Sequence, residues 1–143
     1  MDIFTSMQIG ATALKANRIR LNTISSNMAN VETTSTPEGG PYKKKSVYFQ
    51  TAPVSFKEHL DSNLKTALQG VKVTEIVEDK KPPKLVYNPD HPDADDNGYV
   101  AMPNISILEE MVDMMSTTRS YDANTTVIKS AKRMALKSLE IGR

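Results

Sequence analysis

Apolar residues recur with a heptad spacing along the first thirty residues. Counting from Ile3, the seam alternates steps of four and three residues through Met7, Gly10, Leu14, Asn17, Leu21, Ile24, Met28 and Val31. Seven of these nine positions are apolar, and Lys15 and Arg18 fall off the seam. Such a pattern predicts one amphipathic helix from about Ile3 to about Ala29. Asn17 is the polar insert in the seam, of the kind that sets register.

A second helical pattern begins after Pro103. Its seam runs through Ile107, Met111, Met114, Thr118, Tyr121, Thr125, Ile128, Ala135 and Leu139, and Lys132 is its one interruption. Ser106 and Glu109 have the spacing of a capping box, in which the two side chains satisfy exposed backbone groups of the first turn. The sequence therefore predicts a second long helix that starts near Ser106.

The segment between the helices favours loops and short strands. Residues 31–42 are rich in Thr, Ser, Pro and Gly, which predicts a linker or ordered loop. The β-prone runs that follow contain Val47 and Phe49; Val71, Val73, Ile76 and Val77; Leu85 to Tyr87; and Tyr99 with Val100. Leucine and phenylalanine spaced by four residues predict a short helix from Ser55 to Gln69 between the first two runs.

Helix length decides the architecture. Helices of roughly 27 and 36 residues are about 40 and 54 Å long, whereas a compact globule of this chain length is only about 37 Å across. We therefore expect a mainly α fold: an elongated, coiled-coil-like antiparallel pair of terminal helices with a small mixed or β-rich insert projecting from the middle. The predicted ranges are 1–30 and 104–143 for the helices, 31–42 for the loop and 43–103 for the insert.

Two helices cover only one face of each other, so apolar residues beside the seams are expected to stay partly uncovered. These residues are Phe4, Ile9, Ile19, Leu108, Val112 and Met134. Other subunits are the natural cover for such side chains. The sequence thus predicts a protein that assembles.

Composition narrows the partners. Eighteen basic and seventeen acidic residues give a net charge of +1, which offers no strong attraction to nucleic acid. No uninterrupted apolar run approaches the ~18 to 20 residues of a membrane-spanning helix, so no membrane insertion is expected. The first residues lack the basic and apolar regions of a secretory signal. The absence of cysteine excludes disulfides and thiolate chemistry.

The sharpest metal candidate is the acidic loop from Asp93 to Gly98. It matches positions one, three, five and six of an EF-hand loop, but Asn104 stands where a bidentate glutamate belongs. Pro89 and Pro92 also forbid the entering helix. We interpret the loop as an acidic turn that ends at an Asn-Gly hairpin signal. A calcium- or partner-regulated helical adaptor is nevertheless the alternative to an assembly protein.

Catalytic and nucleic-acid readings have little support. Only His59 and His91 offer an imidazole, and neither lies near a nucleophile elbow or a phosphate-binding loop. No cofactor is expected, and the chain is predicted not to be an enzyme. Lys43, Lys44 and Lys45 precede aromatic residues, as in some single-strand binders. A solvated strand edge protected by charge is the favoured interpretation.

Four stretches of sequence resemble the flagellar rod and hook family. The first, from Ser25 to Val31, closes the first helix and looks like the N-terminal signature of that family. The others are Gly39 to Tyr42, Asn88 to Asp95 with Gly98 to Val100, and Glu110 to Asp113 followed by Arg119 to Asn124. The acidic proline loop and the short chain are most similar to the proximal-rod proteins of the basal body.

This resemblance implies a structural subunit of the periplasmic rod, which transmits torque. It also implies export through the flagellar type III apparatus without a cleaved signal peptide. The implied partners are copies of the chain, other proximal and distal rod proteins and the ring-to-rod adaptor, with a rod-cap muramidase as an assembly factor. The expected assembly residues act by burial or by amide hydrogen bonds, and are Leu14, Leu21, Ile24, Asn27, Asn30, Met111, Met115, Tyr121, Asn124 and Ile128.

Overall fold

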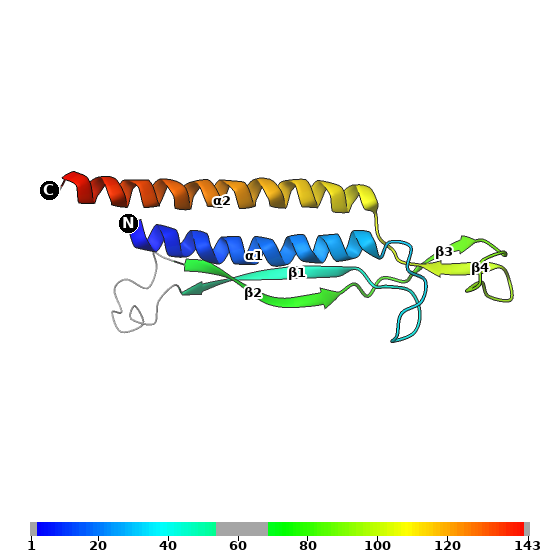
Figure 1. Ribbon diagram of the computed structural model, residues 1–143. Helices are drawn as coiled ribbons and strands as arrows, with labels where there is room; N and C mark the ends of the chain where they lie inside the picture. Colours follow the sequence, from blue (N-terminus) through cyan, green and yellow to red (C-terminus); the bar gives the residue numbers. More distant parts are fainter. Residues whose placement is uncertain (1–2, 54–68, 142–143) are drawn as a thin grey trace.

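The two chain ends form long antiparallel helices that lie side by side (Figure 1). The computed structural model describes residues 3–53 and 69–141. Helix α1 spans Ile3–Ala29 and helix α2 spans Ile107–Ile141, with 27 and 35 residues. Both agree with the lengths expected from the heptad patterns, and the bounds of α1 match the prediction. The mainly α fold class is therefore confirmed.

The N-terminus of α2 is capped by Ser106, which provides the hydroxyl half of the predicted capping box. The Ser106 hydroxyl oxygen accepts a hydrogen bond from the Glu109 backbone N–H at 3.4 Å, and the Ser106 carbonyl accepts one from the Glu110 N–H at 3.1 Å. Glu109 and Glu110 lie in the first turn, where their negative charge favours the positive end of the helix dipole. These groups explain why the helix begins at Ile107.

The seam of α2 differs from the predicted seam at most of its alternate positions. Met114, Tyr121, Ile128 and Ala135 are half-buried, as expected for seam residues. The positions between them that turn inward are each one residue earlier than predicted: Glu110, Thr117, Asn124 and Ala131 are buried or half-buried. The predicted seam residues Ile107, Met111, Thr118 and Leu139 are exposed, as is the predicted interruption Lys132, whereas Thr125 is half-buried as predicted. Because Ala131 takes the place assigned to Lys132, the observed seam contains no charged side chain after Glu110.

In the described part of the middle of the chain, two antiparallel hairpins are present. Strand β1, Lys45–Pro53, pairs with β2, Gln69–Glu78; strand β3, Lys84–Tyr87, pairs with β4, Tyr99–Met102. All four β-prone runs are therefore strands. The helix predicted from Ser55 to Gln69 lies outside the described residues except for Gln69, which begins β2.

The hairpins do not occupy the same place relative to the helices. The β1–β2 hairpin lies along α1, whereas the β3–β4 hairpin extends past the ends of both helices (Figure 1). The Thr12 hydroxyl accepts a hydrogen bond from the Val71 N–H at 3.1 Å, and the Arg20 guanidinium lies 4.1 Å from the centre of the Phe49 ring. Of the two described hairpins, β3–β4 alone projects, and the expectation of a wholly projecting insert is wrong for β1–β2.

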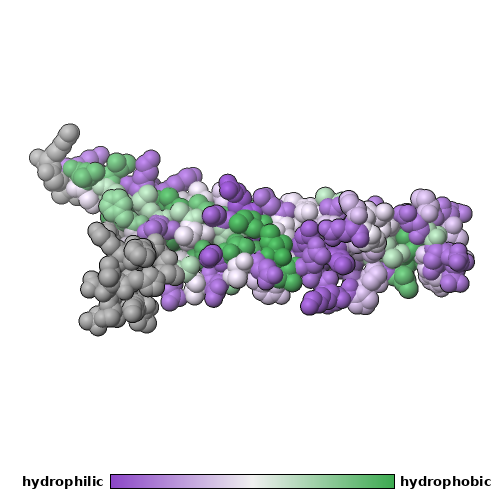
Figure 2. Space-filling view, turned by 90° about the horizontal axis from the view of Figure 1, so that it is seen from below, coloured by the Kyte–Doolittle hydropathy of each residue, from purple (hydrophilic) through white to green (hydrophobic). Residues whose placement is uncertain are grey.

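The hydrophobic core is thin. Among the described residues, the buried hydrophobic side chains are Ala16, Ile24, Val100 and Ala131. Figure 2 shows hydrophobic residues gathered at the surface over the middle of the hairpin side and near the end of α2. In the part of the chain that is described, neither helix has the length and apolarity needed to cross a membrane. Much of the apolar surface is thus left at the exterior of a single chain.

Candidate functional site

One face of α2 exposes a continuous apolar surface, which we call the outer face. It consists of Leu108, Met111, Val112 and Met115, whose exposed fractions are 72%, 47%, 58% and 55%. Their spacing of three and four residues places them on one side of a helix. The buried positions Glu110 and Thr117 point the other way, toward α1. The outer face therefore lies opposite the seam, where nothing in the described chain covers it.

Further large apolar side chains are exposed at the opposite end of the helix pair. Phe4 in α1 is 71% exposed, and Met134, Leu136 and Leu139 in α2 are 56%, 52% and 72% exposed. Four of the six side chains expected to remain uncovered are therefore exposed: Phe4, Leu108, Val112 and Met134. Ile9 and Ile19 are half-buried. The hairpin that lies along α1 accounts for this partial cover.

The ten expected assembly residues fall into three groups. Met111 and Met115 belong to the exposed outer face, while Ile24 and Asn27 are buried inside the subunit, at 5% and 1% exposure. The other six are half-buried along the helix pair: Leu14, Leu21, Asn30, Tyr121, Asn124 and Ile128. The structure therefore does not gather them at one site, although Ile24 and Asn27 line the same cleft. Their contribution to assembly stays a prediction.

A buried polar cluster joins α1, α2 and the start of β1; we call it the polar junction and define it as Asn27, Tyr42, Lys44, Lys45 and Glu110. The Asn27 amide nitrogen donates to the Lys45 carbonyl at 2.9 Å and to Glu110 Oε2 at 3.0 Å. Its Oδ1 accepts from the Tyr42 hydroxyl at 3.1 Å and from the Lys45 N–H at 2.9 Å. Every hydrogen-bonding position of the amide is thus used.

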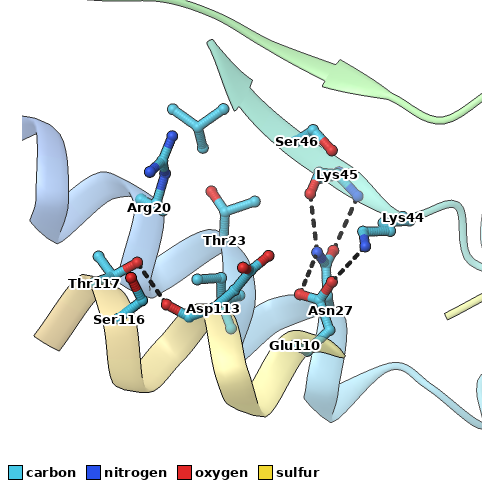
Figure 3. A pocket seen from close by; sticks show the side chains of 12 residues that line it. Arg20, Thr23, Asn27, Lys44, Lys45, Ser46, Glu110, Asp113, Ser116 and Thr117 are labelled. Carbon is cyan, nitrogen blue, oxygen red and sulfur yellow. Dashed lines mark hydrogen bonds and ion pairs between the residues drawn. The ribbon is translucent and has the colours of Figure 1, made fainter. Parts of the chain in front are cut away.

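Glu110 completes the polar junction with an ion pair. Its Oε1 lies 2.7 Å from Lys44 Nζ, and Figure 3 shows Asn27 and Lys44 converging on the carboxylate from two elements. Glu110 is 1% exposed as a residue, and the Lys44 side chain is 23% exposed. The pKa of Lys44 is raised above its ordinary value of 10.5, mainly by the hydrogen bond to Glu110, although partial burial opposes the rise.

A cleft of about 270 Å³ opens beside the polar junction. Residues of α1, α2 and the start of β1 line it, including Arg20, Asp113 and Thr117 (Figure 3). The Thr117 hydroxyl donates to the Asp113 carbonyl of its own helix at 2.7 Å. Basic and acidic groups both face the cleft, so it offers no uniform charge to a ligand.

The acidic loop is organised by its own backbone. Asp95 Oδ1 accepts from the N–H groups of Asn97 and Tyr99 at 2.9 and 2.8 Å, and Asp93 Oδ2 accepts from the Thr34 hydroxyl at 2.6 Å. Gly98 adopts a φ of 79°, in the left-handed region that glycine tolerates. Within residues 3–53 and 69–141, no three His, Asp or Glu side chains group as metal ligands do. The loop is therefore built as a turn.

Sequence reasoning missed the ionic half of the polar junction. The three consecutive lysines were interpreted as a solvated strand edge, which is wrong for Lys44 because its ammonium is paired with a buried carboxylate. The sequence places Glu110 only in the stretch from Glu110 to Asp113 that resembles the flagellar rod family, and predicts no ion pair for it. The available signal was the position of the Glu110 carboxylate, one residue before the predicted seam residue Met111. A seam that lies one residue earlier at this point turns Glu110 toward α1.

Comparison with known proteins identifies the family. Residues 96–141 match the model described as flagellar basal body rod FlgEFG protein C-terminal, and residues 7–35 match the model described as flagella basal body rod protein. The flagellar basal-body rod protein FlgC of Bacillus subtilis is 44% identical over 150 residues, with 100% of both chains covered. FlgC of Salmonella typhimurium is 42% identical over 143 residues, again with 100% of both covered.

FlgC of Borreliella burgdorferi is 42% identical over 152 residues, which cover 99% of this chain and 98% of the other. These matches span the terminal helices and the insert alike, and they confirm the resemblance to flagellar rod proteins drawn from the sequence motifs. The chain therefore belongs to the flagellar basal-body rod protein FlgC family.

Proposed function

We propose that this chain is a structural subunit of the proximal rod of the flagellar basal body and that it carries torque through the area of its contacts. The observation that carries the proposal is the outer face of α2. Three of its four side chains are more than half exposed, on a folded helix with a capped start. Fully burying one such side chain is worth roughly 1.5 to 3 kcal/mol. A neighbouring subunit that covers this face provides that burial.

The terminal helices are proposed to form the inner tube of the rod, with residues 1–30 and 104–143 as its inner-tube segments. Residues 31–42 act as the connecting loop, and residues 43–103 contact neighbours further out. Met111 and Met115 lie directly on the exposed outer face. Methionine suits such a surface because its flexible thioether adapts to contacts that differ from one neighbour to the next.

The proposed partners are other copies of the chain, other proximal and distal rod proteins, and the ring-to-rod adaptor. A rod-cap muramidase is a proposed assembly factor. We further propose that the chain reaches the periplasm through the flagellar type III apparatus without loss of a signal peptide. No step in this function requires a cofactor or a catalytic residue.

Limited proteolysis of the full chain, alone and assembled with other rod proteins, tests the proposal. We expect both termini to be cut quickly in the isolated chain and to be protected in the assembly. Termini that resist the protease equally in the lone monomer would contradict an assembly that completes them. A Met111→Ser, Met115→Ser variant is expected to assemble poorly, whereas the matched exposed variant Thr118→Ser, Ser120→Ala should assemble normally.

A further inference from the structure

The contact between α1 and α2 repeats every seven residues, so its apolar residues alone do not define one alignment. Along α1 the buried seam positions are Gly10, Asn17 and Ile24; on α2 the strongly buried ones include Thr117 and Ala131. Two heptad surfaces match again after a slide of seven residues, which is about 10 Å. The half-buried leucines, methionines and isoleucines of the two seams also recur with this period, so a slide exchanges one apolar contact for another and another interaction must fix the alignment.

Glu110 distinguishes one alignment from the others. It is a buried carboxylate whose two oxygens are each taken by a different element, Oε2 by Asn27 of α1 and Oε1 by Lys44 next to β1. A slide of one heptad removes this carboxylate from both partners. A buried charge without its partner is strongly unfavourable, whereas the alignment that preserves both contacts is not penalised.

Arg20 does not offer Glu110 an equivalent alternative. It lies seven residues before Asn27, so a slide in one direction carries Glu110 toward it. Its guanidinium is already stacked on Phe49 at 4.1 Å from the ring centre. Pairing with Glu110 would take Arg20 from that ring and would still leave Lys44 without its carboxylate.

We propose that Glu110, held by Asn27 and Lys44, is a register lock that selects the observed alignment of α1 and α2. The lock ties α2 to α1 and to the first strand at one point. It thereby sets how far α2 runs beyond the start of α1 and where the outer face lies relative to the hairpin. This inference concerns the fold of the subunit and holds whether or not the proposed rod function is correct.

Engineered disulfides measure the alignment directly, because the chain contains no cysteine. A β-carbon on Gly10 would lie 2.9 Å from Ile128 Cγ1 and 3.9 Å from the Asn124 carbonyl oxygen. One turn further along α1, Ala13 is therefore expected opposite Asn124. The pair Ala13→Cys, Asn124→Cys reports the observed alignment; Ala13→Cys with Thr117→Cys or Ala131→Cys reports slides of one heptad.

With the lock intact, we expect oxidation of the full-length chain to cross-link the Ala13–Asn124 pair at least tenfold faster than either shifted pair. Replacement of both charges, Lys44→Met with Glu110→Leu, keeps the site filled by apolar groups and so preserves folding better than a single change. In that background the preference is expected to fall to threefold or less. Helix content by circular dichroism verifies that the variant is folded.

The control is Lys137→Met with Glu140→Leu, which removes an exposed ion pair from α2 and should leave the cross-linking preference unchanged. A tenfold preference that survives in the Lys44→Met, Glu110→Leu variant overturns the proposal. If that variant does not fold, Glu110→Gln is used, since it keeps the size and one hydrogen bond of the side chain. Its preference should fall at least twofold, and an unchanged preference overturns the lock equally.

Discussion

The ammonium of Lys44 couples the stability of the subunit to alkaline pH. Its pKa in the folded chain is raised above 10.5, with the hydrogen bond to Glu110 as the largest cause. A lysine whose pKa is higher in the folded state binds its proton more tightly there. The resulting stabilisation is complete below pH 10.5 and is lost as the pH rises through the folded-state pKa.

We therefore expect the free energy of unfolding to decrease as the pH is raised from 9 to beyond 10.5, and the decrease to be smaller in Lys44→Met. Urea unfolding followed by circular dichroism at several pH values measures it. Lys43→Met, which removes an exposed neighbouring lysine, is the control. An alkaline loss of equal size in both variants would refute the assignment to Lys44.

The residues of the polar junction show what a single sequence lacks. Asn27 belongs to the stretch from Ser25 to Val31 that resembles the rod family. Two of its hydrogen-bond partners, Lys45 and Glu110, are 18 and 83 positions away in the chain. Periodicity describes one helix at a time and carries no information about which side chain of a distant segment it meets. The burial of Lys44 and Glu110 follows from tertiary packing alone.

At the scale of the helix pair, Gly10 marks a close approach of α1 and α2. A β-carbon added there would lie 2.9 Å from Ile128 Cγ1, inside van der Waals contact. Glycine in a helix interior ordinarily costs about 1 kcal/mol relative to alanine. A change from glycine to alanine would therefore ordinarily stabilise the helix by that amount. We expect Gly10→Ala to give little or none of this stabilisation, because Ile128 must move to admit the methyl group.

A double-mutant cycle isolates that contact. In an Ile128→Ala background the same Gly10→Ala change should stabilise the chain by about 1 kcal/mol, because the obstructing atoms are gone. The free energies of unfolding of the four proteins in urea give the coupling. Equal effects of Gly10→Ala in the two backgrounds would show that the close approach carries no energetic weight.

The positions of the two helices could be predicted from the sequence, but the face of α2 that packs against α1 could be predicted only in part. The four-three pattern from Ile3 to Met28 located α1 because apolar residues dominate its seam. In α2, apolar residues lie on both sides: Met111 and Met115 belong to the outer face, whereas Ala131 is the seam residue. A helix that serves both an internal contact and an exposed surface carries two overlapping patterns of apolar residues. The large exposed side chain of Met111 therefore fell on the predicted seam in place of its neighbour Glu110.

At the scale of the whole molecule, the position of the β1–β2 hairpin was the least predictable feature. Alternating residues located its strands, but an insert of this composition can pack on either helix or on neither. The Thr12 hydroxyl and the Arg20 side chain hold it along α1. Both are ordinary polar residues of an amphipathic helix, and only the folded chain reveals that they face a strand rather than solvent.

The same lengthwise arrangement leaves the end of α2 beyond the start of α1, without a partner helix among the described residues. Since Gly10 lies against Ile128, the start of α1 at Ile3 is reached near Ala135, and α2 continues to Ile141. Leu136 and Leu139 in this overhang are 52% and 72% exposed. Two leucines exposed on an overhanging helix contribute little to the monomer and are available for contact with a neighbouring subunit.

We expect Leu136→Ser with Leu139→Ser to change the free energy of unfolding of the monomer by no more than about 0.5 kcal/mol for each residue. Assembly should weaken at least tenfold, because burial of one leucine is worth roughly 1.5 kcal/mol or more and about 1.4 kcal/mol corresponds to a factor of ten. Sedimentation of the chain with other rod proteins measures assembly. Lys137→Ser with Glu140→Ser is the matched control, since it alters the same turns without changing net charge or removing either leucine. A large loss of monomer stability would place the leucines in an internal contact, and normal assembly would exclude the overhang from the subunit interface.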